Sequence, residues 1–401
     1  MLASKAGAEH TSPFETAPAG LILGDYFVSY SDIDGIKIRP YSAEALAIHA
    51  LDYELTPNVI SYWESDGDEG SPPSHPRVFL DLFLKRSLTR PLEEEEVQEE
   101  LDNEIQAKIE TICEWIGLAL LGVCTMEATA LVIHGSGSNG KSVLTSMISD
   151  LFGGERTCHL PPQAMSERFS RAQLFGAAVN VVSEMPEADL LASDTLKAVI
   201  SGDKIEVERK HRDPFSFRPR AAHVFAANNL PSSRDRSHGL WRRLVPVQFC
   251  HEFSEADKDR QLLNKLREEY ALIVPYCLDR AREYFRRGGY AHQQEIEKWR
   301  MDWRSDVDSV AAFARDLCEI CEPKEGLQTI EIWREFVAYC EDRGQSGGAK
   351  MSQNKLIRQL SALPSVRKTR RRINGSRCYV LNLKLIKQRD LNAWPTARGA
   401  S

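Results

Sequence analysis

The stretch Ala130-Leu-Val-Ile-His134, followed by Gly135-Ser-Gly-Ser-Asn-Gly140-Lys141-Ser142, decides the fold of this 401-residue chain. Its first half is an apolar run typical of a buried strand, and residues 143–152 after it have the pattern of a helix. The second half fits G-x-x-x-x-G-K-[ST] in the strand–loop–helix setting that this motif requires. Glycines let backbone N–H groups curl around phosphate oxygens, and the helix N-terminus adds positive potential. The stretch therefore predicts a phosphate-binding loop rather than a glycine-rich turn with a chance lysine.

Every residue of this loop is a candidate phosphate ligand, namely Gly135, Ser136, Gly137, Ser138, Asn139, Gly140, Lys141 and Ser142. The Lys141 ammonium should reach the β- and γ-phosphates of a nucleotide, and the Ser142 hydroxyl should ligate Mg²⁺. ATP and Mg²⁺ are therefore the small molecules that we expect the chain to bind.

A carboxylate at the end of a neighbouring strand is the second requirement of such a site, because it orients the attacking water or holds Mg²⁺. Residues 179–182 are apolar, and Ser183-Glu184 follows them. We expect Glu184 to activate the water and to contribute to the Mg²⁺ site. Ser183 stands where many such enzymes carry a second acid, so Mg²⁺ should depend more on Ser142 and water. The alternative is a glutamate that merely ends a strand, which the spacing from Lys141 disfavours.

Apolar runs separated by helical stretches indicate the fold class. Residues 223–227 form a third apolar run, and the order strand, helix, strand, helix, strand is typical of an α/β parallel sheet. Toward the N-terminus, Leu21 to Tyr30 and Gly35 to Arg39 are expected to be strands. The acidic run 93–104 is expected to start a helix that ends near Gly122.

Composition bounds the class of protein. With 42% apolar and 27% charged residues, the chain is globular rather than disordered. It has no run of about eighteen apolar residues and no apolar segment near its N-terminus, so we expect no membrane span, no secretory signal and a cytoplasmic location. The net charge of −7 argues against a nucleic-acid partner. Residues 350–389, however, hold twelve Lys or Arg and no acid, and such a local charge binds phosphates whatever the overall sum.

The order of the motifs resembles superfamily 3 helicases, most closely the C-terminal half of phage and plasmid primase–helicases and their poxvirus relatives. The resemblance runs from about residue 20 to residue 390. The motifs that carry it are GSGSNGKS, RFSRAQLFGAAVNVVSE ending at Glu184, LKAVISGDKIEVERKHRDPFSFRP, HVFAANNLP and LWRRLVPVQF. It implies an AAA+-like P-loop core, a homo-hexameric ring, and movement along single-stranded and forked DNA in a bacterial cell or an infected host. It also implies a primase as a further partner.

Two more residues of the site follow from this resemblance. Asn228, which ends the third strand, matches the family's polar sensor of the γ-phosphate or the attacking water; the alternative is a turn asparagine before Pro231. Arg243 matches the arginine finger, which reaches the ATP of a neighbouring subunit and stabilises charge in the transition state. Arg242 is the rival for this role, and a solvated arginine pair is the alternative to both. The expected catalytic set is Lys141, Glu184, Asn228 and Arg243.

A β-hairpin is expected between these motifs, with strands at Ile205–Val207 and Phe215–Phe217 and a basic tip. Four basic side chains on one turn would repel one another without an anionic partner. In related viral ring helicases a Lys-His pair at this place grips the DNA backbone in the central pore, and Lys210 and His211 match it. A solvated charged turn is the alternative. The expected DNA contacts here are Arg209, Lys210, His211 and Arg212.

The basic C-terminal segment resembles a winged helix. Residues 352–363 would be the recognition helix, and residues 366–373 and 377–383 would form the wing around an Asn-Gly turn, a strong hairpin signal. Basic side chains that neutralise DNA phosphates give binding that weakens with salt and depends little on the base sequence. The alternative is a basic hairpin that packs on the acidic run 93–104. The expected DNA-binding residues are Arg367, Lys368, Arg370, Arg371, Arg372 and Arg377.

Together these observations predict four parts. Residues 1–105 form an N-terminal region with an acidic linker helix, 106–310 the ATPase core with its helical elements, 311–390 the winged-helix domain and 391–401 a tail. The expected activity is ATP-dependent DNA unwinding in the replication of a phage, plasmid or viral-type replicon. The alternative is an ATP-switched DNA-binding initiator or adaptor without processive unwinding, which needs no pore hairpin.

Overall fold

The computed structural model describes residues 19–31, 35–42, 49–93, 96–185, 193–228, 238–307, 309–322, 324–343, 351–363, 365–373 and 376–385. Contacts divide the chain into two compact units. The first unit contains residues 1–235 and 242–299, and the second contains residues 236–241 and 300–401. The partition predicted at residues 105 and 310 is not decided by these contacts and stays a prediction.

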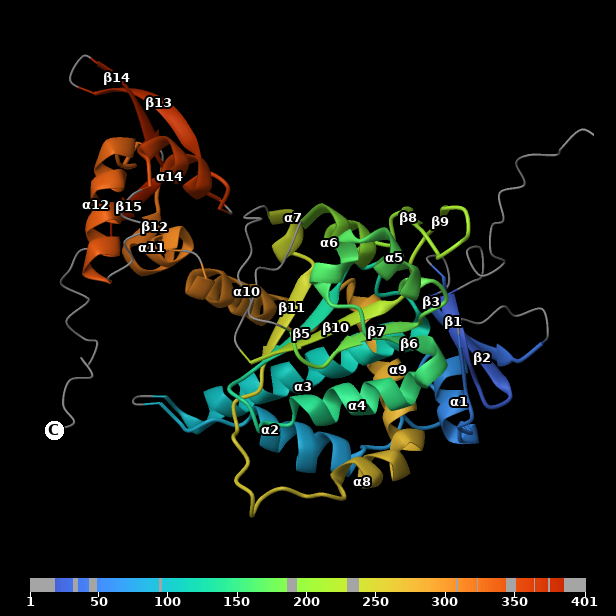
Figure 1. Cartoon of the computed structure of the whole chain (residues 1–401). Coiled ribbons are helices and arrows are strands. Elements are labelled where there is room, and N and C mark those ends of the chain that lie inside the picture. Colours follow the sequence, from blue (N-terminus) through green and yellow to red (C-terminus); the bar gives the residue numbers. More distant parts are fainter. Residues whose placement is uncertain are drawn as a thin grey trace, which may run out of the picture. The chain divides into compact units, whose positions relative to one another are not determined.

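A parallel five-stranded sheet forms the centre of the first unit, in the order β11-β5-β10-β7-β6 (Figure 1). Every neighbouring pair in this sheet is parallel. The strands are β5 (Ala130–His134), β6 (Thr157–Cys158), β7 (Val179–Val182), β10 (Ala222–Ala227) and β11 (Leu244–Gln248). Strands β7 and β10 are buried at every position, as expected for a parallel sheet covered on both faces. The predicted α/β class with a parallel sheet is confirmed.

Helices α3 (Gln98–Leu121), α4 (Lys141–Phe152), α8 (Leu262–Glu268) and α9 (Tyr270–Arg287) share one apolar core with this sheet. The predicted helix before Gly122 is confirmed, since α3 ends there with Gly122 in the left-handed conformation. Its start differs from the prediction. The Glu96 carboxylate is held by Arg90 at 2.7 and 2.8 Å and accepts the Glu93 N–H, which keeps this part of the acidic run outside the helix.

The N-terminal strands form a smaller sheet in the order β3-β2-β1-β4. They are β1 (Ala19–Leu23), β2 (Tyr26–Ser31), β3 (Gly35–Pro40) and β4 (His49–Leu51), followed by α1 (Pro57–Glu64), the π-helix η2 (Val78–Lys85) and α2 (Arg86–Leu88). The single strand expected from Leu21 to Tyr30 is in fact two. Gly24, at φ +55°, makes the turn between β1 and β2.

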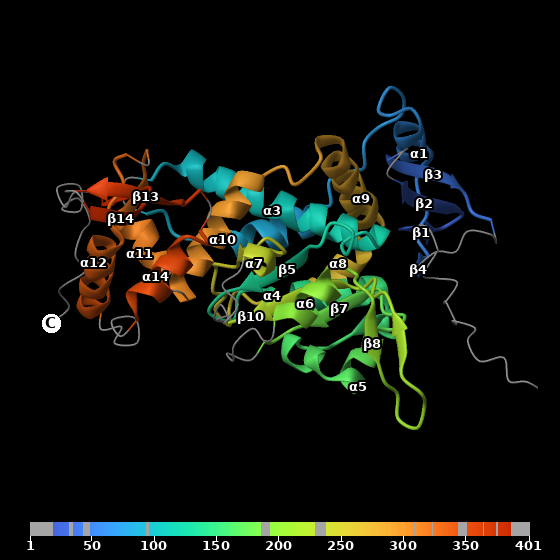
Figure 2. The same cartoon turned by 90° about the horizontal axis from the view of Figure 1, so that it is seen from above.

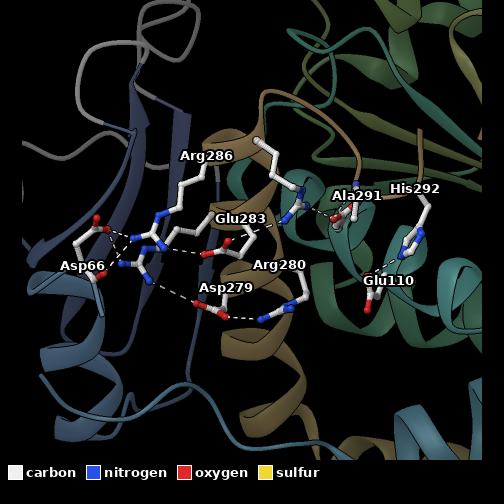
Figure 3. A network of polar contacts seen from close by, with 11 residues as sticks. Asp66, Glu110, Asp279, Arg280, Glu283, Arg286, Ala291 and His292 are labelled. Atoms are coloured by element: carbon white, nitrogen blue, oxygen red, sulfur yellow. Dashed lines mark hydrogen bonds and ion pairs between the residues drawn. The ribbon is translucent and has the colours of Figure 1, made fainter. Parts of the chain in front are cut away.

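Polar contacts join this N-terminal part to helix α9. Asp66 accepts hydrogen bonds from Arg282 at 2.6 Å and from Arg286, and Figure 3 shows Asp66 facing Arg286 across the two elements. The Trp63 indole donates to Asp279 at 3.2 Å. Because these partners lie more than two hundred residues apart in sequence, residues 19–88 are a fixed part of the first unit and not a separate appendage.

Several short helical elements precede the predicted hairpin in the chain. They are η3 (Gly154–Arg156), η4 (Pro162–Ser166), α5 (Arg168–Arg171), η5 (Ala172–Leu174) and α6 (Ser193–Ile200). Strands β8 (Ile205–Val207) and β9 (Phe215–Phe217) pair antiparallel, which confirms the predicted hairpin. Figure 2 shows its turn extending away from the central sheet beside α5.

The second unit combines helices with a β-hairpin. It contains α7 (His238–Trp241), α11 (Ser309–Leu317), β12 (Cys318–Ile320), α12 (Thr329–Asp342), α14 (Gln353–Leu360) and strands β13 (Lys368–Ile373), β14 (Ser376–Leu381) and β15 (Leu383–Leu385). Helix α10 (Gln293–Val307) leads into it. Its core includes the fully buried Phe313, Phe336 and Leu356. The predicted helix and the predicted strand pair are confirmed as α14 and as β13 with β14, whereas the Asn-Gly turn lies outside the described residues.

Candidate functional site

A cavity of about 650 Å³ lies at the carboxyl end of the central sheet, within the first unit. One half of its wall comes from the phosphate loop and from the residues that follow β7 and β10. These residues are Gly137, Ser138, Asn139, Gly140, Lys141, Ser142, Ser183, Glu184 and Asn228. Gly135 and Ser136 belong to the loop but are not among the lining residues. The structure therefore brings together Lys141, Ser142, Glu184 and Asn228, four residues that sequence reasoning placed in one site.

The loop is held in shape by its own side chains. Lys141 is only 6% exposed, and its ammonium donates to the Gly135 carbonyl at 2.7 Å and to the Asn139 amide oxygen at 2.9 Å. The buried Asn139 amide in turn donates to the Phe249 carbonyl at 3.1 Å. Burial lowers the pKa of Lys141, and the negative charge of Glu184 acts in the opposite direction. A cation is thus fixed where anionic phosphates would meet it.

Two glycines of the loop are required by the space around them. A Cβ at Gly135 would lie 2.1 Å from the Asn139 amide nitrogen and 2.2 Å from the Phe249 carbonyl oxygen. Gly140 has φ +91°, and a Cβ there would lie 2.7 Å from the Ser87 hydroxyl. Side chains at these places would displace the loop, so the motif glycines are explained by packing as well as by backbone freedom.

Glu184 and Asn228 reach the cavity because their strands are neighbours. Strand β10 lies between β5 and β7, and all three run in the same direction. Glu184 follows β7 and Asn228 follows β10, and both side chains are exposed. The Met185 N–H donates to the Ala226 carbonyl at 2.7 Å, which fixes the end of β7 to the end of β10. A carboxylate and an amide therefore line the same cavity as Lys141.

The donors at this place suit a hard cation. Ser142 is the exposed second residue of helix α4, and the Glu184 carboxylate lines the same cavity. Hydroxyl and carboxylate oxygens, completed by phosphate oxygens and water, are the ligands that Mg²⁺ takes in nucleotide sites. Ser183 is exposed beside them and supplies no charge.

Arg243 lies at the opposite end of the sheet. Its carbonyl accepts the Ala130 N–H at 2.8 Å, which places it at the start of β5, whereas the phosphate loop follows the end of that strand. Five residues of strand span about 16 Å. The half-buried guanidinium donates to the Ser201 hydroxyl at 2.8 Å, and burial followed by the charge of Arg242 lowers the pKa of Arg243. Arg242 is exposed. The structure therefore does not bring Arg243 to the cavity of its own chain.

The four basic residues of the β8–β9 turn have different surroundings. The Arg209 guanidinium lies over the rings of Phe175 and Phe215, 5.0 and 5.1 Å from their centroids. Lys210, His211 and Arg212 are exposed, and His211 adopts φ +60°. Cation–π contacts of this kind stabilise by about 0.5–2 kcal/mol. Arg209 therefore braces the hairpin against the aromatic residues, and the other three point to solvent.

The basic residues of the second unit follow the alternation of strand β13. Lys368 lies 4.2 Å from the Tyr379 ring centroid, and Arg370 donates to the Tyr379 hydroxyl at 2.6 Å. Arg371, on the other face, donates to the Lys324 carbonyl. Arg367 and Arg372 are exposed, and nothing is described of the Arg377 side chain. One face of the hairpin thus presents Lys368, Arg370 and Arg372 to solvent.

Sequence reasoning missed the other half of the cavity wall. It is formed by η2, by Arg86 and by residues 253–265. Val78, Leu82 and Arg86 stand four residues apart, a spacing that places side chains on one face of an ordinary helix. That signal was available, but nothing in the sequence relates this segment to one nearly two hundred residues away.

The comparisons with known proteins agree with a helicase-like chain at low identity. Residues 133–243 match the model of DUF5906, a family of unknown function. The protein named "Putative helicase L207/L206" of Acanthamoeba polyphaga mimivirus is 24% identical over 246 residues, which are 54% of this chain and 26% of that protein. "Putative helicase 121R" of Invertebrate iridescent virus 3 is 23% identical over 154 residues, 36% of this chain and 16% of that protein. The chain thus spans about a quarter or less of these relatives.

Solved structures similar to this chain include those of the C-terminal region of NrS-1. The A form of the apo C-terminal region of NrS-1 aligns with a TM-score of 0.43 and 11% identity, covering 88% of this chain and 82% of that one. A second apo structure of the same region, residues 305–718, aligns with a TM-score of 0.40.

Within the part of the chain that the structure describes, no helix combines the length and apolar character needed to cross a membrane.

Proposed function

We propose that this chain is an ATP-dependent DNA helicase of superfamily 3, which translocates on single-stranded DNA as a ring in phage, plasmid or viral-type replication. The observation that carries the proposal is the meeting of Lys141, Ser142, Glu184 and Asn228 at one cavity. A buried cation, a hydroxyl, a carboxylate and an amide at the carboxyl end of a parallel sheet are the groups that phosphoryl transfer to water requires. The named viral relatives support the choice of a helicase among P-loop proteins.

Each group has one task in this mechanism. The ammonium of Lys141 and the backbone N–H groups of the loop bind the β- and γ-phosphates of ATP. Glu184 accepts a hydrogen bond from the attacking water and aligns it with the γ-phosphorus. Asn228, on the neighbouring strand, hydrogen-bonds the γ-phosphate or that water. Ser142 and Glu184 would hold Mg²⁺, which when bound neutralises charge on the phosphate oxygens.

Arg243 completes the site of a neighbouring copy. It lies about 16 Å from its own phosphate loop, at the far end of β5, so it acts only across a subunit boundary. A guanidinium that enters the site from outside stabilises the charge that develops in the transition state. This geometry favours a closed ring in which each chain gives its phosphate loop to one boundary and its arginine to the other.

Two basic surfaces hold the DNA. Lys210, His211 and Arg212 line the exposed turn of the β8–β9 hairpin, which Arg209 braces against Phe175 and Phe215. In the second unit α14 and the β13–β14 hairpin form a winged helix, whose basic face binds phosphates without reading sequence. ATP hydrolysis moves the first surface while the second keeps the chain on the polynucleotide.

The test is strand displacement on forked DNA with ATP, run with the wild-type chain, Lys141→Ala and Lys204→Ala. Lys204 precedes β8 outside the phosphate loop and serves as the matched control. We expect unwinding by the wild-type chain and by the control, and none by Lys141→Ala. Unwinding that survives the loss of Lys141 would contradict the proposed function.

A further inference from the structure

The second half of the cavity wall contains both apolar and charged residues. Its apolar part includes Val78, Leu82, Leu262 and Phe253, and its charged part includes Arg86, Lys258 and Lys265. Leu82 is 45% exposed although the residues that follow it, Phe83 and Leu84, are buried. An apolar side chain left open at a cavity wall, with a phosphate loop at the other end of that cavity, suggests a ligand with one apolar end and one anionic end.

The helix that carries Leu82 is held in place from outside. Residues 78–85 form a π-helix, a wide helical form that is uncommon and often found at functional sites. Its first N–H groups, from Val78 and Phe79, donate to the Glu269 carboxylate at 2.9 and 3.0 Å. Because a side chain between α8 and α9 caps it, this helix cannot slide without breaking those bonds. The wall is therefore fixed before a ligand arrives.

The backbone at Phe253 is hydrogen-bonded to the phosphate loop. The Phe253 N–H donates to the Ser138 carbonyl at 2.9 Å, and the Cys250 and His251 N–H groups donate to the Ser87 carbonyl at 3.0 and 3.1 Å. The Arg86 guanidinium lies over the Phe253 ring, 5.5 Å from its centroid. One short segment thus joins the phosphate loop to Ser87 of α2, directly after the π-helix, and sets the spacing between the two halves of the cavity.

We propose that Val78, Leu82, Phe253 and Leu262 form the base-binding wall of this site, and that it favours purine over pyrimidine nucleotides. The inference rests on the proposed function for the phosphate half of the cavity. A nucleobase is flat and apolar on its faces, and it is the one part of a nucleotide that such side chains would contact. A bicyclic purine buries more of this apolar surface than a single pyrimidine ring, so it binds more tightly.

The experiment measures equilibrium binding of ADP, CDP and inorganic pyrophosphate to the full chain with Mg²⁺, so that no turnover intervenes. We expect the wild-type chain to bind ADP more tightly than CDP, and CDP more tightly than pyrophosphate. Leu82→Ala should weaken ADP binding about tenfold and leave pyrophosphate binding unchanged, because an exposed leucine can be shortened without disturbing the fold. Leu272→Ala is the matched control, since Leu272 is 39% exposed on α9 and does not line the cavity.

Failure of this inference differs from failure of the proposed function. If the wild-type chain binds ADP no more tightly than pyrophosphate, or if Leu82→Ala weakens both ligands equally, the base wall is wrong while the phosphate site stands. If Lys141→Ala leaves the binding of both ligands unchanged, the phosphate site is wrong, and the base wall falls with it.

Discussion

The carboxyl and amino ends of the central sheet are built from the same strands but differ in what one chain can accomplish there. At the carboxyl end Lys141, Glu184 and Asn228 share one cavity, and the lysine is bonded to the loop around it. At the amino end Arg243 is bonded to Ser201, about 16 Å from that cavity. Phosphate binding should therefore be a property of the single chain, and rapid hydrolysis a property of two chains in contact.

The largest effect on ATP hydrolysis is expected from a substitution at the amino end of the central sheet. Arg243→Ala should lower kcat for ATP hydrolysis by about 10³- to 10⁵-fold with little change in nucleotide affinity, because an arginine supplied from a neighbour acts on the transition state. Steady-state kinetics and nucleotide binding measure the two quantities separately. Arg242→Ala is the matched control, and it should have a much smaller effect. A larger loss of kcat from Arg242→Ala than from Arg243→Ala would identify Arg242 as the arginine finger.

At the carboxyl end of the sheet, replacing the Glu184 carboxylate by an amide of the same shape should separate ATP binding from ATP hydrolysis. Glu184→Gln should lower kcat by about 10²- to 10⁴-fold, the range for a lost general base, and leave ATP bound. Ser183→Ala, one residue earlier on the same strand end, should have little effect on either quantity. Equal losses in the two variants would mean that the end of β7 is required only for its shape.

The residues that could be predicted from sequence are those fixed by short-range spacing. The phosphate loop, Glu184 and Asn228 each follow an apolar strand, and parallel strands bring their carboxyl ends to one edge. Arg242 and Arg243 could not be ranked, because adjacent residues have the same sequence signal and differ only in burial. Contact with Ser201, forty-two positions earlier, makes that difference.

Long-range packing explains what sequence could not predict. The DNA contact predicted at Arg209 stays a prediction, but local spacing does not indicate that its guanidinium lies over two phenylalanine rings, one of them from a residue more than thirty positions away. The base-binding wall depends likewise on Glu269 capping η2 across nearly two hundred residues. Such pairs leave no trace in local spacing.

A pH titration of folding should report on helix α3 rather than on either end of the sheet. Burial raises the pKa of Glu114 to about 7, although Arg287 pairs with it. Below the ordinary value of 4.5 the carboxyl is protonated in both states; between 4.5 and 7 only the unfolded chain ionises. Folding stability should therefore fall as pH rises through this range, by on the order of 3 kcal/mol.

Denaturant unfolding of the wild-type chain and Glu114→Gln between pH 5 and pH 8 measures this effect. Glu114→Gln has no carboxyl at this position, so its folding stability should lack the fall between pH 5 and pH 8. Glu110, one turn earlier, is the control: burial acts to raise its pKa, but hydrogen bonds with Gln106 and His292 outweigh it and lower that pKa. Glu110→Gln should therefore keep the fall in stability between pH 5 and pH 8. An unchanged pH profile in Glu114→Gln would contradict the assignment.

The smallest effects on ligand affinity are expected at the DNA surfaces. Arg370→Ala with Arg372→Ala should reduce the slope of log affinity against log salt by roughly 1.4 on single-stranded DNA, at about 0.7 for each phosphate contact. Lys210→Ala with His211→Ala should keep most of the affinity and abolish unwinding. If this second variant still unwinds DNA, or if the wild-type chain binds DNA in response to ATP but never unwinds it, the chain is an ATP-switched initiator or adaptor instead.

Mixing Lys141→Ala with Arg243→Ala tests the central claim most directly. Each variant alone lacks one half of every site, whereas a boundary between the two kinds of chain can pair an intact phosphate loop with an intact Arg243. We predict that the mixture, under conditions where labelled subunits are seen to exchange, hydrolyses ATP far faster than either variant alone. A mixture that exchanges subunits and stays as inactive as its components would contradict the account, as would full activity of a wild-type monomer.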